Sequence, residues 1–259
     1  MCEKYHSRID ILTISDNEIK DLPVGQWSTM MYYKLFMPVI LPRFVERCLF
    51  LDVDMIINDD IDSLYHWNLQ GHVIAATEDI PDCVVIKERI GLNKDDLYIN
   101  AGVMVCDIVK WREMETEKPI FDFIRTVANR IVNEQDVLAL YFKGLITLLP
   151  IRWNMVTFYY FREPKIFPKY QSELQAGKRD PGIIHFAAPI KPWFRDCQHP
   201  FKYLYKYFLK KTVWGGNYVF PYWENLTWRQ RVNKVVRKFL NKYGFIKDPL
   251  YLVPLSKWL

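Results

Sequence analysis

The chain has 259 residues, of which 50% are hydrophobic and 16% aromatic, a composition that suits one large domain or one domain with an appendage. The five cysteines never have CxxC spacing, which argues against a disulfide framework and against a thiolate zinc site. The opening sequence MCEKYHSRID lacks the apolar core of a signal peptide, and no run approaches ~18 apolar residues, so we expect a cytoplasmic protein that does not span a membrane.

The formal net charge of +5 is distributed unevenly along the chain. From Phe201 to the last residue there are twelve Lys and Arg against two acidic residues, so the preceding part is mildly acidic. An anionic partner is therefore expected at the tail rather than at the body. We predict a main domain over residues 1–200 and a basic, aromatic, helical region over residues 201–259.

The predicted elements mix strands and helices. Apolar residues alternate in residues 8–14, which indicates a strand, and residues 27–41 have a helical spacing that Pro38 and Pro42 are expected to end. Residues 47–57, RCLFLDVDMII, are interpreted as one buried strand. Further strands are predicted at 72–79, 98–107, 144–150 and 180–186, and helices at 119–132 and 134–143. This mixture predicts an α/β fold whose sheet is covered on both faces.

Several polar residues fall at the predicted carboxyl ends of these strands, where open α/β sheets bind ligands: Asp52, Asp54, Glu78, Asn100 and His185. In an extended segment residues i and i+2 point the same way, so the first two carboxylates can share one divalent cation. Hard oxygen ligands suit magnesium or manganese. The acids at 59, 60 and 62 are instead typical of a solvated turn before a helix.

Two enzyme classes use a DxD pair at the end of a strand. A phosphatase of the haloacid dehalogenase kind has DxDx(T/V), but Ile56 stands where the hydroxyl is expected, and no later strand ends convincingly in a second acidic pair. In nucleotide-sugar transferases the pair holds the metal that bridges a diphosphate. A lone DxD does not separate these classes.

Further motifs accompany the pair in a characteristic order. They are MYYKL (31–35), FLDVDMII (50–57), YINAGVMVCDIVKWR (98–112), NEQDVLALYF (133–142), RWN (152–154) and IIHFAAPIKPW (183–193). In order and spacing the chain resembles glycosyltransferase family 8, the retaining transferases of bacterial lipopolysaccharide and other surface glycans, related to glycogenin. The resemblance runs from about residue 26 to residue 193. It implies a GT-A-like fold with a mixed, mostly parallel central sheet and makes residues 1–200 the catalytic domain.

The resemblance implies a metal and phosphate site in one group of residues. Asp52 and Asp54 would hold Mn²⁺ (or Mg²⁺) together with His185, and the metal would bind both phosphates of a UDP-sugar. Lys191 would contact a phosphate oxygen. Ala188 belongs to the same loop, which usually contains glycine, so backbone approach to the diphosphate is expected to differ here.

The resemblance implies a sugar and catalytic site in a second group. Glu78, or Asp79 in its place, would accept hydrogen bonds from the hydroxyls of the donor sugar, and Asn100 and Ala101 would face that sugar. Lys34 stands where many relatives have Arg, so a bidentate contact becomes a point-charge contact.

The catalytic residues implied by the resemblance are three neighbours in NEQD. Gln135 would lie next to the anomeric carbon, and Glu134 and Asp136 flank it. The same segment is typical of a helix start in which Asn133 is the cap and acids occupy the first turn, and both interpretations can hold together.

Family members begin with a strand–helix–strand that this sequence lacks, about 60 residues at ~30 residues per strand–helix unit. We therefore expect an exposed apolar sheet edge beside the DxD strand, and a segment 8–14 that docks elsewhere, pairs with another molecule or is loosely held. The main alternative to an active enzyme is a non-catalytic fragment or binding subunit of such a transferase.

The implied reaction is transfer of a glucose or galactose from a UDP-sugar to a hydroxyl of a growing glycan or glycolipid, with retention at the anomeric carbon. Residues 228–243 have an apolar helical face and six basic residues without an acid. Such a helix suits the anionic inner face of a membrane, and packing against the body is the alternative. No nucleic-acid partner is expected.

Overall fold

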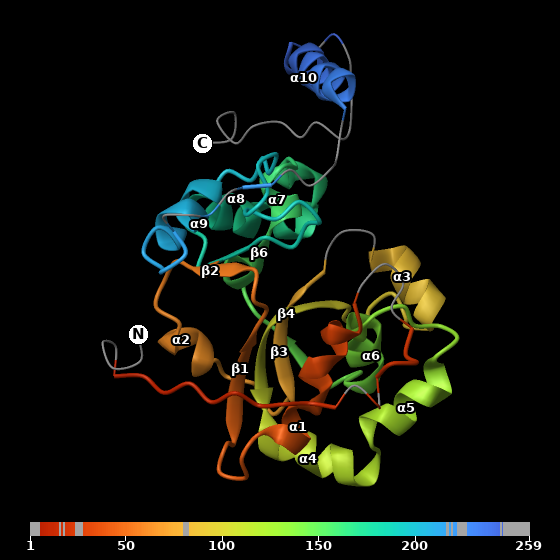
Figure 1. Ribbon diagram of the computed structural model, residues 1–259. Helices are drawn as coiled ribbons and strands as arrows, with labels where there is room; N and C mark the ends of the chain where they lie inside the picture. Colours follow the sequence, from red (N-terminus) through yellow and green to blue (C-terminus); the bar gives the residue numbers. More distant parts are fainter. Residues whose placement is uncertain are drawn as a thin grey trace. The chain divides into compact units, whose positions relative to one another are not determined.

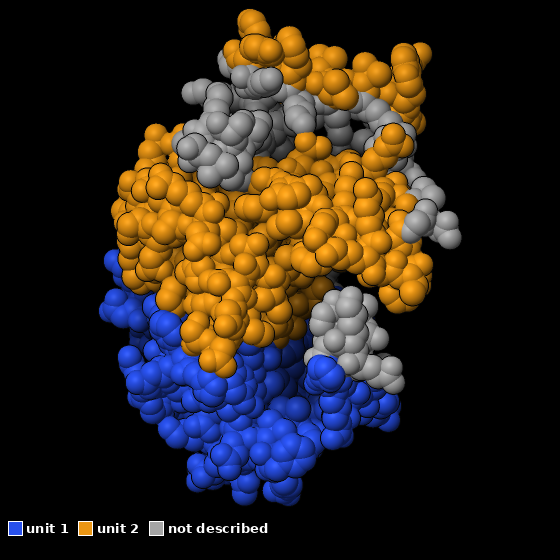
Figure 2. All heavy atoms as spheres, turned by 90° about the vertical axis from the view of Figure 1, so that its left-hand side faces the viewer, with its two compact units in different colours: residues 1–50, 65–149 blue, residues 51–64, 150–259 orange. Residues whose placement is uncertain are grey.

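The computed structural model describes residues 6–15, 17, 19–23, 28–79, 83–215, 218, 220–221, 227–243 and 245 (Figure 1). The chain forms two compact units, coloured separately in Figure 2. Unit 1 comprises residues 1–50 and 65–149, and unit 2 comprises residues 51–64 and 150–259. The chain thus passes from unit 1 to unit 2 immediately before the DxD pair. The predicted division at residue 200 stays a prediction.

Unit 1 is built on a four-stranded sheet of order β1-β4-β3-β5. The strands are β1 (Arg47–Leu51), β3 (Ile74–Glu78), β4 (Ile99–Asp107) and β5 (Ile146–Leu148). β3 is fully buried and runs antiparallel to β4 and parallel to β5. β1 lies at the edge of this sheet, as expected for the DxD strand, and all five of its residues are only partly buried.

The helices of unit 1 bury apolar residues in two clusters, a large core and a smaller one that contains Ile90. They are the 3₁₀ helix η3 (Thr29–Phe36), α1 (Met37–Ile40), α3 (Cys83–Ile90), α4 (Ile108–Glu117), α5 (Ile120–Val127) and α6 (Glu134–Tyr141). Trp111 of α4 and Phe142, which follows α6, meet edge to face with ring centroids 4.9 Å apart. Pro38 does not end the helical segment as predicted, because it lies in the first turn of α1, where proline leaves no hydrogen bond unmade.

Unit 2 contains a three-stranded sheet of order β2-β7-β6. The strands are β2 (Met55–Ile57), β6 (Met155–Val156) and β7 (Ile183–His185), and β7 runs antiparallel to β2 and parallel to β6. The helices are α2 (Asp62–Tyr65, whose last residue belongs to unit 1), η4 (Ile151–Asn154), α7 (Thr157–Tyr160), η5 (Pro164–Ile166), η6 (Pro168–Tyr170), α8 (Gln171–Arg179), α9 (Lys202–Leu209) and α10 (Trp228–Lys242). In the part of the chain that the structure describes, no helix combines the length and hydropathy needed to cross a bilayer.

The predicted α/β fold with mixed sheets is confirmed. The pairs β3–β5 and β6–β7 are parallel, and the pairs β3–β4 and β2–β7 are antiparallel.

Two predicted strands differ in the structure. Residues 47–57 are not one strand: β1 ends at Leu51 and β2 begins at Met55, and the two belong to different sheets. The two carboxylates at 52 and 54 occupy the break between them, where they avoid burial inside a sheet. Residues 8–14 form no strand either, and Ile11 is 90% exposed. Alternating apolar residues give a strand only where a neighbour supplies hydrogen bonds.

Candidate functional site

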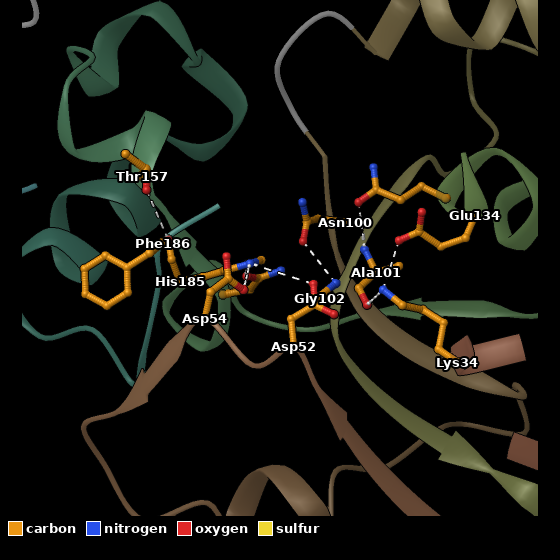
Figure 3. A network of polar contacts seen from close by, with 12 residues as sticks. Lys34, Asp52, Asp54, Asn100, Ala101, Gly102, Glu134, Thr157, His185 and Phe186 are labelled. Carbon is orange, nitrogen blue, oxygen red and sulfur yellow. Dashed lines mark hydrogen bonds and ion pairs between the residues drawn. The ribbon is translucent and has the colours of Figure 1, made fainter. Parts of the chain in front are cut away.

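Asp52, Asp54 and His185 converge in unit 2. One potential ligand atom from each lies within 4.8 Å of the others. The antiparallel register of β2 and β7 pairs Met55 with His185, which brings the end of β7 beside the DxD turn. The amide of Phe186 donates to the carbonyl of Asp54 at 2.9 Å and extends this pairing by one step. Figure 3 shows the imidazole directed toward the carboxylates.

A hydrogen bond behind His185 determines which ring nitrogen faces the acids. Its Nδ1 lies 2.8 Å from Oδ1 of the fully buried Asn154. Because the amide oxygen only accepts, Nδ1 donates to it, and Nε2 is the ring nitrogen that faces the acids. Nε2 lies 3.3 Å from Oδ1 of Asp54 and 3.8 Å from Oδ2 of Asp52. This is the orientation that a metal-binding histidine needs.

Lys191 also engages the DxD pair. Its Nζ donates to Oδ2 of Asp54 at 2.5 Å and to the carbonyl of Phe186 at 2.9 Å. Burial by itself raises the pKa of Asp54, but the hydrogen bonds and positive charges of His185 and Lys191 outweigh it and hold that pKa well below its usual value. Ala188 lies in the same loop, and its amide donates to the carbonyl of Phe186 at 2.7 Å.

The three side chains fit a divalent cation. Two carboxylates and one imidazole form a donor set that manganese accepts, and one ligand atom of each lies within 4.8 Å of the others. His185 is almost fully buried and Asp52 is about one-third exposed, so the site is buried on the histidine side and open to solvent at Asp52. The predicted metal ligands are thus brought together.

The residues of the second group lie in unit 1, around an irregularity in β4. The pairing of β3 with β4 runs from Ala76↔Met104 directly to Thr77↔Asn100, so three extra residues, 101–103, bulge out of β4. Asn100 is the second residue of β4, not the end of a strand as predicted. It reaches the same edge as Glu78 because β4 is antiparallel to β3. Bulges of this kind often direct side chains into active sites.

Predicted site residues satisfy the backbone groups that the bulge frees from the ladder. The amide of Ala101 donates to Oε1 of Gln135 at 3.1 Å, and its carbonyl accepts from Nζ of Lys34 at 3.1 Å. The amide of Gly102 donates to Oδ1 of Asn100 at 3.1 Å. Figure 3 shows Lys34 and Asn100 directed at this short stretch of backbone, and Glu134 directed at Lys34. Residues 100–103 therefore form one polar network with Lys34, Glu134 and Gln135, which we call the bulge network.

Lys34 and Glu134 form a buried ion pair at 2.9 Å, and 4% and 11% of their side chains are exposed. Lys34 begins in η3 and its ammonium also lies 4.8 Å from the ring centroid of Phe50. Lysine at this position thus makes two point contacts, to a carboxylate and to a carbonyl, where arginine would present a planar fork.

Gln135 connects the bulge to the end of β3. While its Oε1 accepts from Ala101, its Nε2 donates to Oδ2 of Asp79 at 3.0 Å. Glu78 precedes Asp79 at the end of β3, and its Oε1 lies 3.7 Å from Nζ of Lys87. Both candidate sugar-binding acids are therefore part of the same polar surroundings as Gln135.

Asp136 differs from its two neighbours because its side chain is fully buried. Its carboxylate accepts from Arg89, from the hydroxyl of Tyr98 at 2.9 Å and from the amide of Val132 at 2.8 Å. Asn133 caps α6 by accepting from the amide of Asp136 at 3.0 Å, as the sequence predicted. These contacts favour a structural role for Asp136 rather than direct contact with substrate.

Sequence reasoning assigned no role to three residues that the structure places in these networks. Asn154 orients His185, and its only signal was its place in the motif RWN. Lys87 and Arg89 of α3 reach Glu78 and Asp136, and nothing in their spacing indicated these contacts.

Comparisons with known proteins identify relatives. The lipopolysaccharide 1,2-glucosyltransferase of Escherichia coli K12 is 27% identical over 219 residues, which cover 83% of this chain and 64% of that protein. General stress protein A of Bacillus subtilis is 25% identical over 191 residues, 71% of this chain and 66% of that protein. The chain therefore spans slightly less than two thirds of the length of these two relatives.

Solved structures agree in fold. The galactosyltransferase LgtC in complex with donor and acceptor sugar analogues has a TM-score of 0.65 and 21% identity, covering 79% of this chain and 77% of that one. This likeness shows a GT-A-like fold. The sequence profile described as Glycosyl transferase family 8 matches residues 3–197, which is most of the chain. The chain therefore belongs to glycosyltransferase family 8.

Proposed function

We propose that this protein transfers a hexose, glucose or galactose, from a UDP-sugar to a hydroxyl of a growing surface glycan or lipopolysaccharide-type acceptor, with retention of configuration. Membership of family 8 replaces the phosphatase interpretation of the DxD pair. The names of the Escherichia coli relative and of LgtC, a glucosyltransferase and a galactosyltransferase, agree with a hexose donor. The proposed acceptor class rests on the names of relatives that are lipopolysaccharide glucosyltransferases.

The observation that carries the proposal is the Asp52–Asp54–His185 cluster with its oriented imidazole. A divalent cation bound there, Mn²⁺ or Mg²⁺, would neutralise charge on the diphosphate of the donor. Lys191 adds a positive charge beside the same carboxylates and would contact a phosphate oxygen once the donor is bound.

We assign the donor hexose to the bulge network. Glu78, Asp79 and Asn100 supply oxygen acceptors for sugar hydroxyls. The backbone of Ala101, in the bulge, would lie close to the ring of the donor sugar. Gln135 lies beside these groups with both ends of its amide hydrogen-bonded. A carboxamide is a poor nucleophile, so a front-side displacement fits this residue better than a covalent intermediate. A covalent intermediate would instead need a carboxylate nucleophile, and Glu134, which is paired with Lys34, is the candidate for that role.

The direct test measures UDP release from UDP-glucose and UDP-galactose with Mn²⁺ and then with a chelator. The proposal expects release that depends on the metal with one of the two donors, and faster release when a lipopolysaccharide-type acceptor is added. The alternative, a binding subunit without activity, predicts that UDP binds in the presence of Mn²⁺ but that neither donor is consumed.

The role of Asn154 in orienting His185 can be measured by metal binding alone. Asn154→Ala removes the acceptor for Nδ1–H, so the ring can rotate or change tautomer. We expect the affinity for Mn²⁺, measured by electron paramagnetic resonance, to fall by about 10- to 100-fold, the usual range for loss of such a partner. His185→Ala should lose at least as much. Unchanged Mn²⁺ affinity in Asn154→Ala would show that the hydrogen bond does not prepare a metal ligand.

We further propose that α10 attaches the protein to an anionic membrane surface. Its apolar side chains are exposed, among them Trp228 at 75%, Val235 at 69% and Phe239 at 56%. No acidic residue lies between 228 and 243, and six are basic. Each positive charge near anionic lipid contributes about 1 kcal/mol to binding. The proposal places the protein peripherally on the inner face of the membrane.

Sedimentation with vesicles tests this attachment. The protein should pellet with vesicles that contain phosphatidylglycerol and not with pure phosphatidylcholine, and binding should weaken as salt is raised. Val235→Ser together with Phe239→Ser should reduce pelleting about 10-fold, because exposed apolar area is lost. Phe44→Ser, at an exposed site in unit 1, is the control. Equal pelleting with both vesicle types would refute the electrostatic attachment.

A further inference from the structure

Helix α3 bears two basic residues that contact Glu78 and Asp136, two acidic residues beside the bulge network. The sequence alone predicts no role for this helix. Nζ of Lys87 lies 3.7 Å from Oε1 of Glu78. Nη2 of Arg89 donates to both carboxylate oxygens of Asp136, at 3.1 Å and 2.9 Å. Nη1 of Arg89 also donates to the carbonyl of Arg130 at 3.1 Å. One helix thus contacts the end of β3 and the start of α6.

The contact between Arg89 and Asp136 joins a partly exposed cation to a fully buried anion. About one third of the Arg89 side chain is exposed, whereas Asp136 is not exposed at all. Without the guanidinium, the carboxylate would keep two neutral donors, Tyr98 and Val132, among the partners described above. A buried carboxylate in that state is costly, so the first turn of α6 would shift to reach water.

A shift of that turn would be transmitted to Gln135, which precedes Asp136 directly. Gln135 holds the amide of Ala101 on one side and the carboxylate of Asp79 on the other. Both contacts have ordinary hydrogen-bond lengths, so a displacement of about 1 Å would break one or both. Arg89 itself makes no described contact with Ala101 or Asp79.

We propose that Arg89 is a positioning residue: through Asp136 it fixes the first turn of α6 and thereby the direction of Gln135 toward the β4 bulge. The assignment of the bulge to donor-sugar binding rests on the proposed function, but the mechanical link between Arg89 and the bulge does not. Because the planar guanidinium contacts Asp136 through Nη2 and the carbonyl of Arg130 through Nη1, lysine at position 89 can replace its charge but not this two-nitrogen geometry.

Hydrogen exchange of the Ala101 amide measures the mechanical link without any ligand. In Arg89→Met we expect this amide to exchange about 10-fold faster than in the wild type, because its acceptor Gln135 is displaced. Arg89→Lys should give an intermediate rate. Arg125→Met is the matched control, since Arg125 pairs with Asp122 on the exposed surface of α5. An unchanged rate at Ala101 in a folded Arg89→Met variant would overturn the proposal.

A second variant keeps the test decisive if Arg89→Met does not fold. In Arg89→Met with Asp136→Asn the buried charge is removed together with its partner, so folding no longer suffers from an unpaired anion. The Ala101 amide should still exchange faster in this variant, because the guanidinium no longer holds the turn. A wild-type rate there would overturn the proposal as well.

Ligand titration then tests whether the contact between Arg89 and Asp136 affects binding of the donor sugar. Titration with Mn²⁺ and either UDP or UDP-glucose should show an unchanged affinity for UDP in Arg89→Met, but a loss of about 10-fold in the affinity for UDP-glucose relative to UDP. An equal loss for both ligands would indicate general damage and would contradict the positioning role. If the wild type binds neither ligand, the proposed function fails, while the exchange rates still decide the role of Arg89.

Discussion

Asp54→Ala should reduce Mn²⁺-dependent UDP release by about 100-fold or more, the scale on which loss of a group that stabilises departing charge affects turnover. Asp54 is the member of the cluster that contacts both other functional groups, because one carboxylate oxygen faces His185 and the other accepts from Lys191. Its removal therefore takes away a proposed metal ligand and releases Lys191 at the same time. The rate of UDP release at saturating Mn²⁺, with a chelator as blank, is the measurement.

The fold should survive this substitution. The contact between the DxD turn and β7 uses the backbone carbonyl of Asp54, which alanine retains. Lys191 is one-quarter exposed, so water can solvate its ammonium when the carboxylate is gone. Asp60→Ala is the matched control, since Asp60 lies six positions along the chain and is exposed. Near-normal turnover of Asp54→Ala, with none lost to chelator, would show that the DxD pair does not serve a metal.

Lys34→Met should cost about 3–5 kcal/mol of unfolding free energy, the usual cost of removing one partner from a buried ion pair. The substitution leaves the carboxylate of Glu134 buried beside a methionine and removes the donor to the carbonyl of Ala101. Both losses fall on the bulge network, so turnover should fall together with stability. Urea unfolding followed by circular dichroism measures the free energy.

Two further variants test whether the loss of stability comes from the burial of the ion pair or from the removal of a lysine as such. Lys143→Met breaks an ion pair with Asp96 in which the lysine is 44% exposed, and there we expect a loss of less than about 1 kcal/mol. Lys34→Met combined with Glu134→Gln removes the stranded charge and should recover part of the lost stability. Similar losses in Lys34→Met and Lys143→Met would mean that burial of the first pair contributes nothing.

Local periodicity was enough to predict most elements that surround the site. The strands predicted at 72–79, 98–107, 144–150 and 180–186 are confirmed as β3, β4, β5 and β7, and the helix predicted at 134–143 is confirmed as α6. These segments bury their apolar residues along their own length, so their type follows from neighbours in the sequence.

The strand predictions that failed depend on partners distant in the sequence. Residues 8–14 have the alternation of a strand, but alternation does not supply a neighbouring strand. Residues 47–57 are apolar enough for one strand, yet the two carboxylates divide it between two sheets. Asn100 reaches the edge that we expected only because β4 runs antiparallel to β3, a direction that no local pattern specifies.

The sequence by itself determined the chemistry available to this protein: a carboxylate pair, a histidine, a lysine and the NEQD segment, in the order of family 8. Only the tertiary structure decided how these groups are used. Lys191 contacts Asp54 across 137 positions of the chain, and Asn154 orients His185 from another element. A three-residue bulge binds Lys34 and Gln135, and Arg89 holds α6 from α3. Side-chain type and short-range spacing are written in the sequence, whereas contacts between distant residues depend on strand direction, register and irregularities, which form only when the whole chain packs.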